Sequence, residues 1–244
     1  MPYIQALVAI LVVSALSLAG LLLFGAEARR KLVLNLMALA AGVLAADAFL
    51  HLIPEAAEAM DPERLGMLLL FGVGIFFALE HWLHMRHESH THAPDVLGYL
   101  NLAGDALHNF IDGVLVAAAF VTSWETGIAV TVAVILHELP QEFGDFGVLI
   151  HSGFSRARAI AWNLLSALAA VAGWAVVYGF SRWIDIEAYL PQILAVTAGG
   201  FLYISGAGIF PELKEEGGGR LSWQNFFAIT IAVAFVFGLL LLEG

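Results

Sequence analysis

Two segments of the sequence place imidazole, carboxylate and amide side chains at the spacing of one helix face. The first carries Asp105, His108, Asn109 and Asp112, and the second carries His137, Glu138, Gln141, Glu142 and Asp145. Because residues three and four apart are neighbours on a helix, each set forms one polar face. Imidazole nitrogen and carboxylate oxygen together are a donor set for a borderline divalent cation such as Zn²⁺. The sequence therefore predicts two helices that face each other across a divalent-metal site.

A third segment adds Asp47 and His51, again four residues apart. A lone histidine in an apolar helix is usually packed or hydrogen-bonded to its neighbours, and a lone asparagine such as Asn109 can simply join two helices. Two helices that repeat the same polar pattern are difficult to explain in that way. We therefore count His51 and Asn109 among the candidate ligands, and Asp47, Glu142 and Asp145 as candidate residues of an ion pathway.

Zinc-dependent proteolysis is a competing interpretation of the second segment. Intramembrane zinc proteases need H-E-x-x-H, in which two histidines hold the metal and the glutamate acts as general base. Here the fifth position is Gln141, and Pro140 distorts the turn that would align it with His137. The spacing therefore favours metal binding without chemistry, and we expect a protein that is not an enzyme.

The composition places these residues inside a membrane. Of the 244 residues, 61% are apolar and only 13% are charged, whereas a soluble domain has about 25% charged residues. Apolar runs predict one transmembrane domain over residues 1–244 with eight helices, at 2–24, 32–54, 65–85, 98–122, 127–151, 158–180, 191–212 and 223–242. The fold class is therefore an all-α membrane protein. Small residues of 158–180, including Ser166, Ala170 and Gly173, are expected to allow close helix packing.

The charges orient the chain in the membrane and exclude some partners. A formal net charge of −11 argues against nucleic acid, and the lack of cysteine excludes thiolate ligands. Eight of the ten basic residues fall in or beside the connections on one side, which the positive-inside rule assigns to the cytoplasm. Both termini are then expected on the outer side of a plasma or inner membrane.

Six carboxylates lie inside the predicted helices: Asp47, Asp105, Asp112, Glu138, Glu142 and Asp145. Each charge at the centre of a bilayer costs about 2.5–3.5 kcal/mol. The helices 98–122 and 127–151 contain no Lys or Arg that could compensate. Water, protonation or a bound cation must therefore offset the cost.

Histidines are also concentrated in the connection between the third and fourth helices. His81, His84, His87 and His90 recur every three residues, and His92 follows. The spacing fits a helix face that binds metal at the cytoplasmic mouth, and it equally fits an unstructured polar loop. The candidate metal-binding residues of this loop are His84, His87, His90 and His92.

A short internal echo links the second and seventh helices. Phe49-Leu50-His51 is followed by Pro54-Glu55, and Phe201-Leu202-Tyr203 is followed by Pro211-Glu212. The predicted topology runs these helices in opposite directions, as an inverted repeat requires.

Three of these motifs resemble the ZIP family of divalent metal transporters. The string His108-Asn109-Phe110-Ile111-Asp112-Gly113 is similar to its H-N-x-x-[DE]-G motif. The string His137-Glu138-Leu139-Pro140-Gln141-Glu142 is similar to the H-E-x-P-H-E form of one large subfamily, and Asp47 to Pro54 resembles the second helix of that subfamily. With the eight-helix plan, the resemblance covers essentially the whole chain.

This resemblance implies a 3+2+3 bundle with inverted repeats and a binuclear metal centre. One metal would be bound by His51, His108, Asp112, His137 and Gln141, and the adjoining one by Asn109, Asp112, Glu138 and Gln141. It further implies that the first, fourth, fifth and sixth helices slide as a block against the rest. The chain departs from the subfamily at Gln141, where histidine is usual, and at Ala170, where some relatives have a carboxylate. A neutral amide is a weaker cation ligand than imidazole or carboxylate.

The sequence thus predicts a transporter that carries a divalent metal into the cytoplasm. Zn²⁺ is the expected substrate, with Cd²⁺, Mn²⁺ and Fe²⁺ as alternatives, and no catalytic cofactor is expected. A cation channel is a further alternative to the protease. The expected partners are the metal ion and the lipid bilayer, with a homodimer left open.

Overall fold

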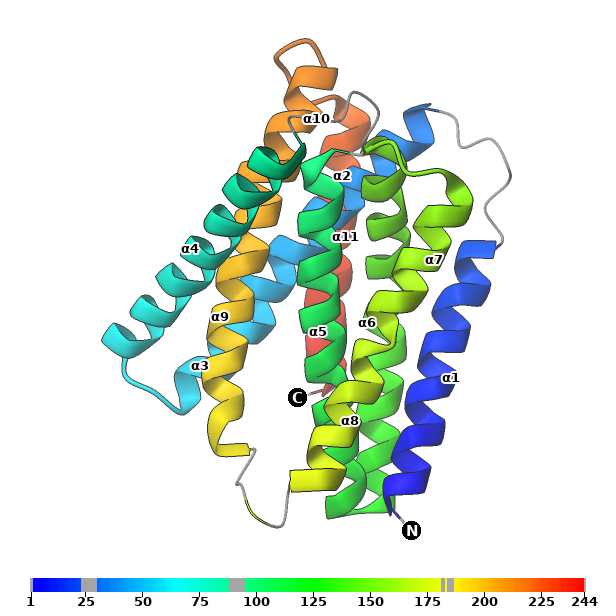
Figure 1. The fold of residues 1–244 in the computed structure, drawn as a ribbon, viewed down its shortest axis with the longest axis vertical. Coiled ribbons are helices and arrows are strands. Elements are labelled where there is room, and N and C mark those ends of the chain that lie inside the picture. Colours follow the sequence, from blue (N-terminus) through cyan, green and yellow to red (C-terminus); the bar gives the residue numbers. More distant parts are fainter. Residues whose placement is uncertain (1, 23–29, 88–94, 181–182, 184–186, 244) are drawn as a thin grey trace.

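The computed structural model describes residues 2–22, 30–87, 95–180, 183 and 187–243, and within these ranges every regular element is helical (Figure 1). The elements, in chain order, are α1 (Pro2–Leu22), α2 (Arg30–Asp47), the π-helical η1 (Ala48–Leu52), α3 (Ile53–Glu58), α4 (Pro62–His87), α5 (Val96–Thr122), α6 (Trp124–His151), α7 (Arg156–Ala167), α8 (Ala169–Phe180), the 3₁₀ turn η2 (Glu187–Tyr189), α9 (Leu190–Tyr203), the π-helical η3 (Ile204–Ile209), α10 (Phe210–Glu216) and α11 (Trp223–Glu243).

Among the described residues, six helical stretches are long and apolar enough to cross a membrane: Arg30–Glu58, Pro62–Arg86, Val96–Thr122, Arg156–Phe180, Leu190–Glu216 and Trp223–Leu241. Large apolar side chains such as Leu70 and Phe71 on α4 and Ile231 on α11 are exposed on the outside of the bundle, as a lipid-facing surface requires. These observations confirm an all-α membrane protein. The remaining expected spans correspond to α1 and to α6, which carries the second polar face. A total of eight crossings stays a prediction.

Two of the long stretches are interrupted by a π-helical turn and continue past a proline. In the first, η1 is followed by α3, and in the second, η3 is followed by α10. Pro54 and Pro211 each stand in the first turn of the helix that follows the π-helical turn, and neither has an N–H that could donate back into that turn. Both stretches therefore extend beyond the predicted ends at 54 and 212. They run in opposite directions in the bundle (Figure 1), so the sequence echo has a structural counterpart.

The helices α5 and α6 lie side by side at the centre of the bundle and position the predicted polar faces (Figure 1). α8 packs against α5 so closely that a Cβ on Gly113 would lie 1.9 Å from the Ala170 carbonyl oxygen. A Cβ on Gly173 would lie 2.1 Å from the Phe110 carbonyl oxygen. The prediction that small residues allow close packing is therefore confirmed for Ala170 and Gly173.

On its other side, α6 packs against α2 along a seam formed by two glycines. A Cβ on Gly144 would lie 2.8 Å from Ala40, and a Cβ on Gly147 would lie 2.4 Å from the Leu36 Cβ. We call this contact the α2–α6 seam. It brings the helix that bears Asp47 and η1 next to the polar face of α6.

Candidate metal centre

The polar faces of α5 and α6 start from fixed helix ends. The Asp95 side chain accepts a hydrogen bond from Leu97 N at the start of α5, and the Ser123 Oγ accepts one from Thr126 N at the start of α6. Such caps satisfy backbone donors that the first helical turn leaves free. α6 continues as one helix through Pro140, so His137 and Gln141 remain one turn apart on its polar face.

Four residues from the two faces converge on one point. One nitrogen or carboxylate oxygen from each lies within 4.8 Å of the others: His108, Asp112, His137 and Glu138. Asp112 Oδ2 lies 3.2 Å from His137 Nε2 and 3.8 Å from His108 Nε2. Asp112 thus contacts a histidine on each of the two helices, and its predicted role as a bridge between two metal ions stays a prediction.

Several polar atoms at this point are buried without a hydrogen-bond partner among the described residues. They include both ring nitrogens of His108 and the Oε1 atom of Glu138. A buried polar atom left unpaired costs about 1–3 kcal/mol. A divalent cation would satisfy these nitrogen and oxygen atoms together, since both are ordinary ligands of Zn²⁺. The donor set and the unpaired atoms therefore fit a metal ion bound as substrate.

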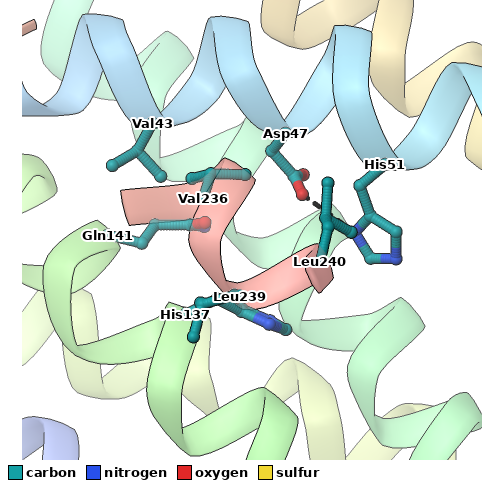
Figure 2. A pocket seen from close by; sticks show the side chains of 8 residues that line it. All are labelled: Val43, Asp47, His51, His137, Gln141, Val236, Leu239 and Leu240. Atoms are coloured by element: carbon teal, nitrogen blue, oxygen red, sulfur yellow. Dashed lines mark hydrogen bonds and ion pairs between the residues drawn. The ribbon is translucent and has the colours of Figure 1, made fainter. Parts of the chain in front are cut away.

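His51 and Gln141 line a small cavity next to the four-residue group. Figure 2 shows them with Asp47 and His137 around this cavity, and the Asp47 carboxylate points toward the His51 ring. His51 Nδ1 lies 3.0 Å from Asp47 Oδ1, and the ring centres of His51 and His137 are 6.5 Å apart. The structure thus brings both residues to the edge of the group without placing them in it.

Asn109 lies beside the group, and its amide nitrogen is held by Asp105. Its Nδ2 donates to Asp105 Oδ1 at 2.8 Å and to the Asp105 backbone oxygen at 3.1 Å. Asn109 and Asp112 also line a small cavity against α1. The residue is therefore placed next to the bridging carboxylate, as predicted, and it is held there by Asp105.

The acids further along α5 and α6 are each paired with a neutral side chain. Asn163 Nδ2 donates to Glu142 Oε2, and Asn101 Nδ2 donates to Asp145 Oδ1, both at 2.9 Å. Ser166 Oγ donates to Asp105 Oδ2. Sequence reasoning missed Asn101 and Asn163, although polar residues in apolar spans were the available signal. The interpretation of Ser166 as a packing residue was incomplete, because its hydroxyl also holds a buried carboxylate.

A larger cavity leads from the centre toward one end of the bundle. It has a volume of about 850 Å³, and its lining includes His51, Glu55 and His137 together with Thr122 and Leu190. We call it the vestibule. Glu55, a residue that sequence reasoning missed, lies 3.3 Å from His51 Nε2 through its Oε2. Its position four residues after His51 could have indicated this contact.

Only part of the histidine-rich segment lies within the described residues. His81 and His84 are exposed on α4, and His84 Nδ1 lies 3.0 Å from the Glu80 backbone oxygen. His87 is the last residue of α4. His90 and His92 lie outside the described residues, so metal binding by this loop stays a prediction.

Together, the helical bundle, its lipid-facing surface and its buried group of histidines and carboxylates indicate an integral membrane protein with side chains of the types that bind divalent cations. The sequence model of the ZIP zinc transporter family matches residues 2–96 and 84–242. The chain belongs to that family. Membership of a family of transporters also confirms the expectation that the chain is not an enzyme.

Curated relatives show the same kinship at the level of whole sequences. Zinc transporter ZIP13 of Pongo abelii is 35% identical over 197 residues, which cover 75% of this chain and 59% of that protein. The ZIP13 homolog of Drosophila melanogaster is 31% identical over 272 residues, covering 84% of this chain and 77% of that protein. Zinc transporter ZIP4 of Mus musculus is 47% identical over 120 residues, which cover 49% of this chain and 18% of that protein. The chain thus spans only part of the length of the relatives it matches.

Proposed function

We propose that this protein carries Zn²⁺ across the membrane into the cytoplasm through the centre between α5 and α6. The observation that carries the proposal is the convergence of His108, Asp112, His137 and Glu138, in which both ring nitrogens of His108 and the Oε1 atom of Glu138 lack hydrogen-bond partners in the described structure. Membership of the zinc transporter family supports zinc as the substrate. Two relatives that match most of this chain are also named as a zinc transporter and as a homolog of one.

The distribution of basic residues supports an inward direction. Arg30, Arg86, Arg156 and Lys214 all belong to helix ends at one side of the bundle (Figure 1). The vestibule extends toward the other side, where Thr122 ends α5 and Leu190 begins α9. Under the positive-inside rule, the vestibule then faces the outside and would admit the ion from there.

The ligand sets expected from the resemblance follow as part of the proposal. Asp112 bridges, His108 and His137 bind from opposite helices, and Glu138 binds at the inner side. His51 and Gln141 join from the adjoining cavity as the helices adjust around an ion, and Asn109 binds beside Asp112. Asp47, Glu142 and Asp145 extend the acidic path on either side of these ligands.

The α2–α6 seam favours a carrier over a channel. Gly144 and Gly147 pack against Ala40 and Leu36 without room for a Cβ, so α2 and α6 leave no passage for an ion at this contact. An ion can then pass only if helices move, which makes transport saturable.

Uptake of ⁶⁵Zn²⁺ into proteoliposomes tests this function. We expect uptake that saturates with Zn²⁺ and that Cd²⁺ inhibits more strongly than Mn²⁺ or Fe²⁺, since imidazole ligands favour softer ions. Protein-free liposomes are the control. Uptake that rises linearly with Zn²⁺ would contradict a carrier, and no uptake above the control would contradict the proposal.

A further inference from the structure

A second group of metal-ligating side chains lies outside the centre, at the end of the bundle opposite the vestibule. One atom each from His151, Glu212 and Glu216 lies within 4.8 Å of the others. His151 ends α6, whereas Glu212 and Glu216 are four residues apart on α10 and therefore share one helix face. His151 Nε2 lies 3.0 Å from Glu212 Oε1. All three residues are half-buried.

The donor set of this group is suited to a borderline divalent cation. One imidazole nitrogen and two carboxylate oxygens can bind Zn²⁺ on three sides and leave the remaining positions to water. The partial exposure of the residues allows that water to enter. An ordinary network of ion pairs is the competing interpretation, because Arg30 also forms an ion pair with Glu216.

The position of the group relative to the α2–α6 seam favours the metal site. On α6, Gly144 and Gly147 form the seam, and His151 follows one turn later on the same face. On α2, Arg30 lies before Leu36, so the paired Arg30 and Glu216 stand where the seam ends. An ion that crossed between α2 and α6 would therefore emerge beside His151, Glu212 and Glu216.

We infer that His151, Glu212 and Glu216 form a second divalent-cation site, which receives the ion after it leaves the centre. Its role in transport rests on the proposed function, whereas its capacity to bind a cation does not. The site is weaker than the centre, because its ligands are partly exposed and the Arg30 guanidinium competes with the cation for Glu216. A weak site suits release, since an ion must leave it again.

Equilibrium dialysis of the purified full-length protein against ⁶⁵Zn²⁺ measures this site without transport. The background variant carries alanine at His108 and His137, and at His84, His87, His90 and His92, so that neither the centre nor the histidine-rich loop contributes. We expect this background to keep one bound Zn²⁺ per chain. His151→Gln or Glu212→Gln in the background should weaken its binding at least tenfold, and Glu215→Gln, on the same helix but outside the group, should not change it.

Arg30→Gln provides an independent test, because it should strengthen Zn²⁺ binding where His151→Gln and Glu212→Gln weaken it. Removal of the competing guanidinium should tighten Zn²⁺ binding about two- to fivefold, the range that an exposed ion pair allows. An ion-pair network without metal predicts no such gain. The site is contradicted if the background binds no Zn²⁺, if His151→Gln and Glu212→Gln bind as the background does, or if Arg30→Gln fails to tighten binding.

The same variants separate this inference from the proposed function. If dialysis confirms the site but the native protein shows no ⁶⁵Zn²⁺ uptake, the proposed function fails and the site stands. If native uptake is normal and the dialysis results contradict the site, this inference fails alone.

Discussion

At the residue scale, the proposed centre is arranged around the carboxylate of Asp112, and the two helices that supply its ligands, α5 and α6, contain no Lys or Arg. Asp112 lies between His137 and His108, which come from α6 and α5. Its type and spacing were sufficient to predict this position, because a helix face is fixed by sequence separation alone. The orientation of Asn109 was not predictable, since it depends on the hydrogen bond that its Nδ2 donates to Asp105, which leaves the amide oxygen as the atom that could bind a metal.

Replacement of Asp112 tests the bridging position. Asp112→Ala should reduce ⁶⁵Zn²⁺ uptake by roughly tenfold or more, because Asp112 is the one carboxylate in the described structure that lies within 4.0 Å of both His108 and His137. Glu63→Ala, on the exposed first turn of α4, is the control: it also removes one carboxylate, but outside the centre, and it should transport normally. Near-native uptake by a folded Asp112→Ala protein would show that the centre lies elsewhere.

Gln141 tests whether the small cavity of Figure 2 belongs to the ion path. Imidazole is a stronger ligand for Zn²⁺ than a neutral amide. We therefore expect Gln141→His to lower the KM for Zn²⁺, to lower or preserve the maximal rate, and to shift selectivity from Mn²⁺ toward Zn²⁺. Uptake of both metals is compared at equal protein abundance. Unchanged KM and rate for both would assign Gln141 a structural role.

At the element scale, the positions of the helices could be predicted from hydropathy, whereas the π-helical turns that interrupt them could not. The predicted span 98–122 corresponds to α5 at Val96–Thr122, and 158–180 to α7 and α8 together. The π-helical turns η1 and η3 escaped prediction, because a run of apolar residues does not distinguish i to i+5 hydrogen bonds from the usual i to i+4 pattern. The hydrogen bond between Asn163 and Glu142 was also not predictable, since contacts between helices depend on how the helices pack.

The α2–α6 seam gives a prediction about an element. Gly144→Ala would place a Cβ 2.8 Å from Ala40, and overpacking of this kind typically costs about 1–3 kcal/mol. We expect a lower melting temperature in detergent and slower Zn²⁺ uptake. Gly74→Ala on α4 is the control, because nothing lies within 4 Å of its added Cβ. Equal melting temperatures for the two variants would contradict a tight seam.

At the scale of the whole molecule, the proposal gives the bundle an open side and a closed side. Thr122 lines the vestibule and Lys214 lies on the exposed surface of α10 at the other end. The distribution of Lys and Arg predicts which end faces the cytoplasm, and this sidedness stays a prediction. The vestibule itself was not, because an internal volume is set by how all of the helices pack.

The lack of cysteine makes this sidedness directly measurable. A membrane-impermeant maleimide should label Thr122→Cys in intact cells and Lys214→Cys only after permeabilisation. The unmodified protein is the control for background labelling. Labelling of Lys214→Cys from outside, with Thr122→Cys protected, would reverse the orientation and with it the proposed direction of transport.

The contrast between the vestibule and the seam also has a consequence for the timing of transport. If the vestibule faces the outside as proposed, an ion can diffuse through it to His51 and His137 without any movement of the helices. On the proposed route, departure on the other side waits until α2 and α6 separate at Gly144 and Gly147, and collective motions of this kind take about microseconds to milliseconds. A higher concentration of metal outside therefore fills the centre sooner, but it does not empty it any faster.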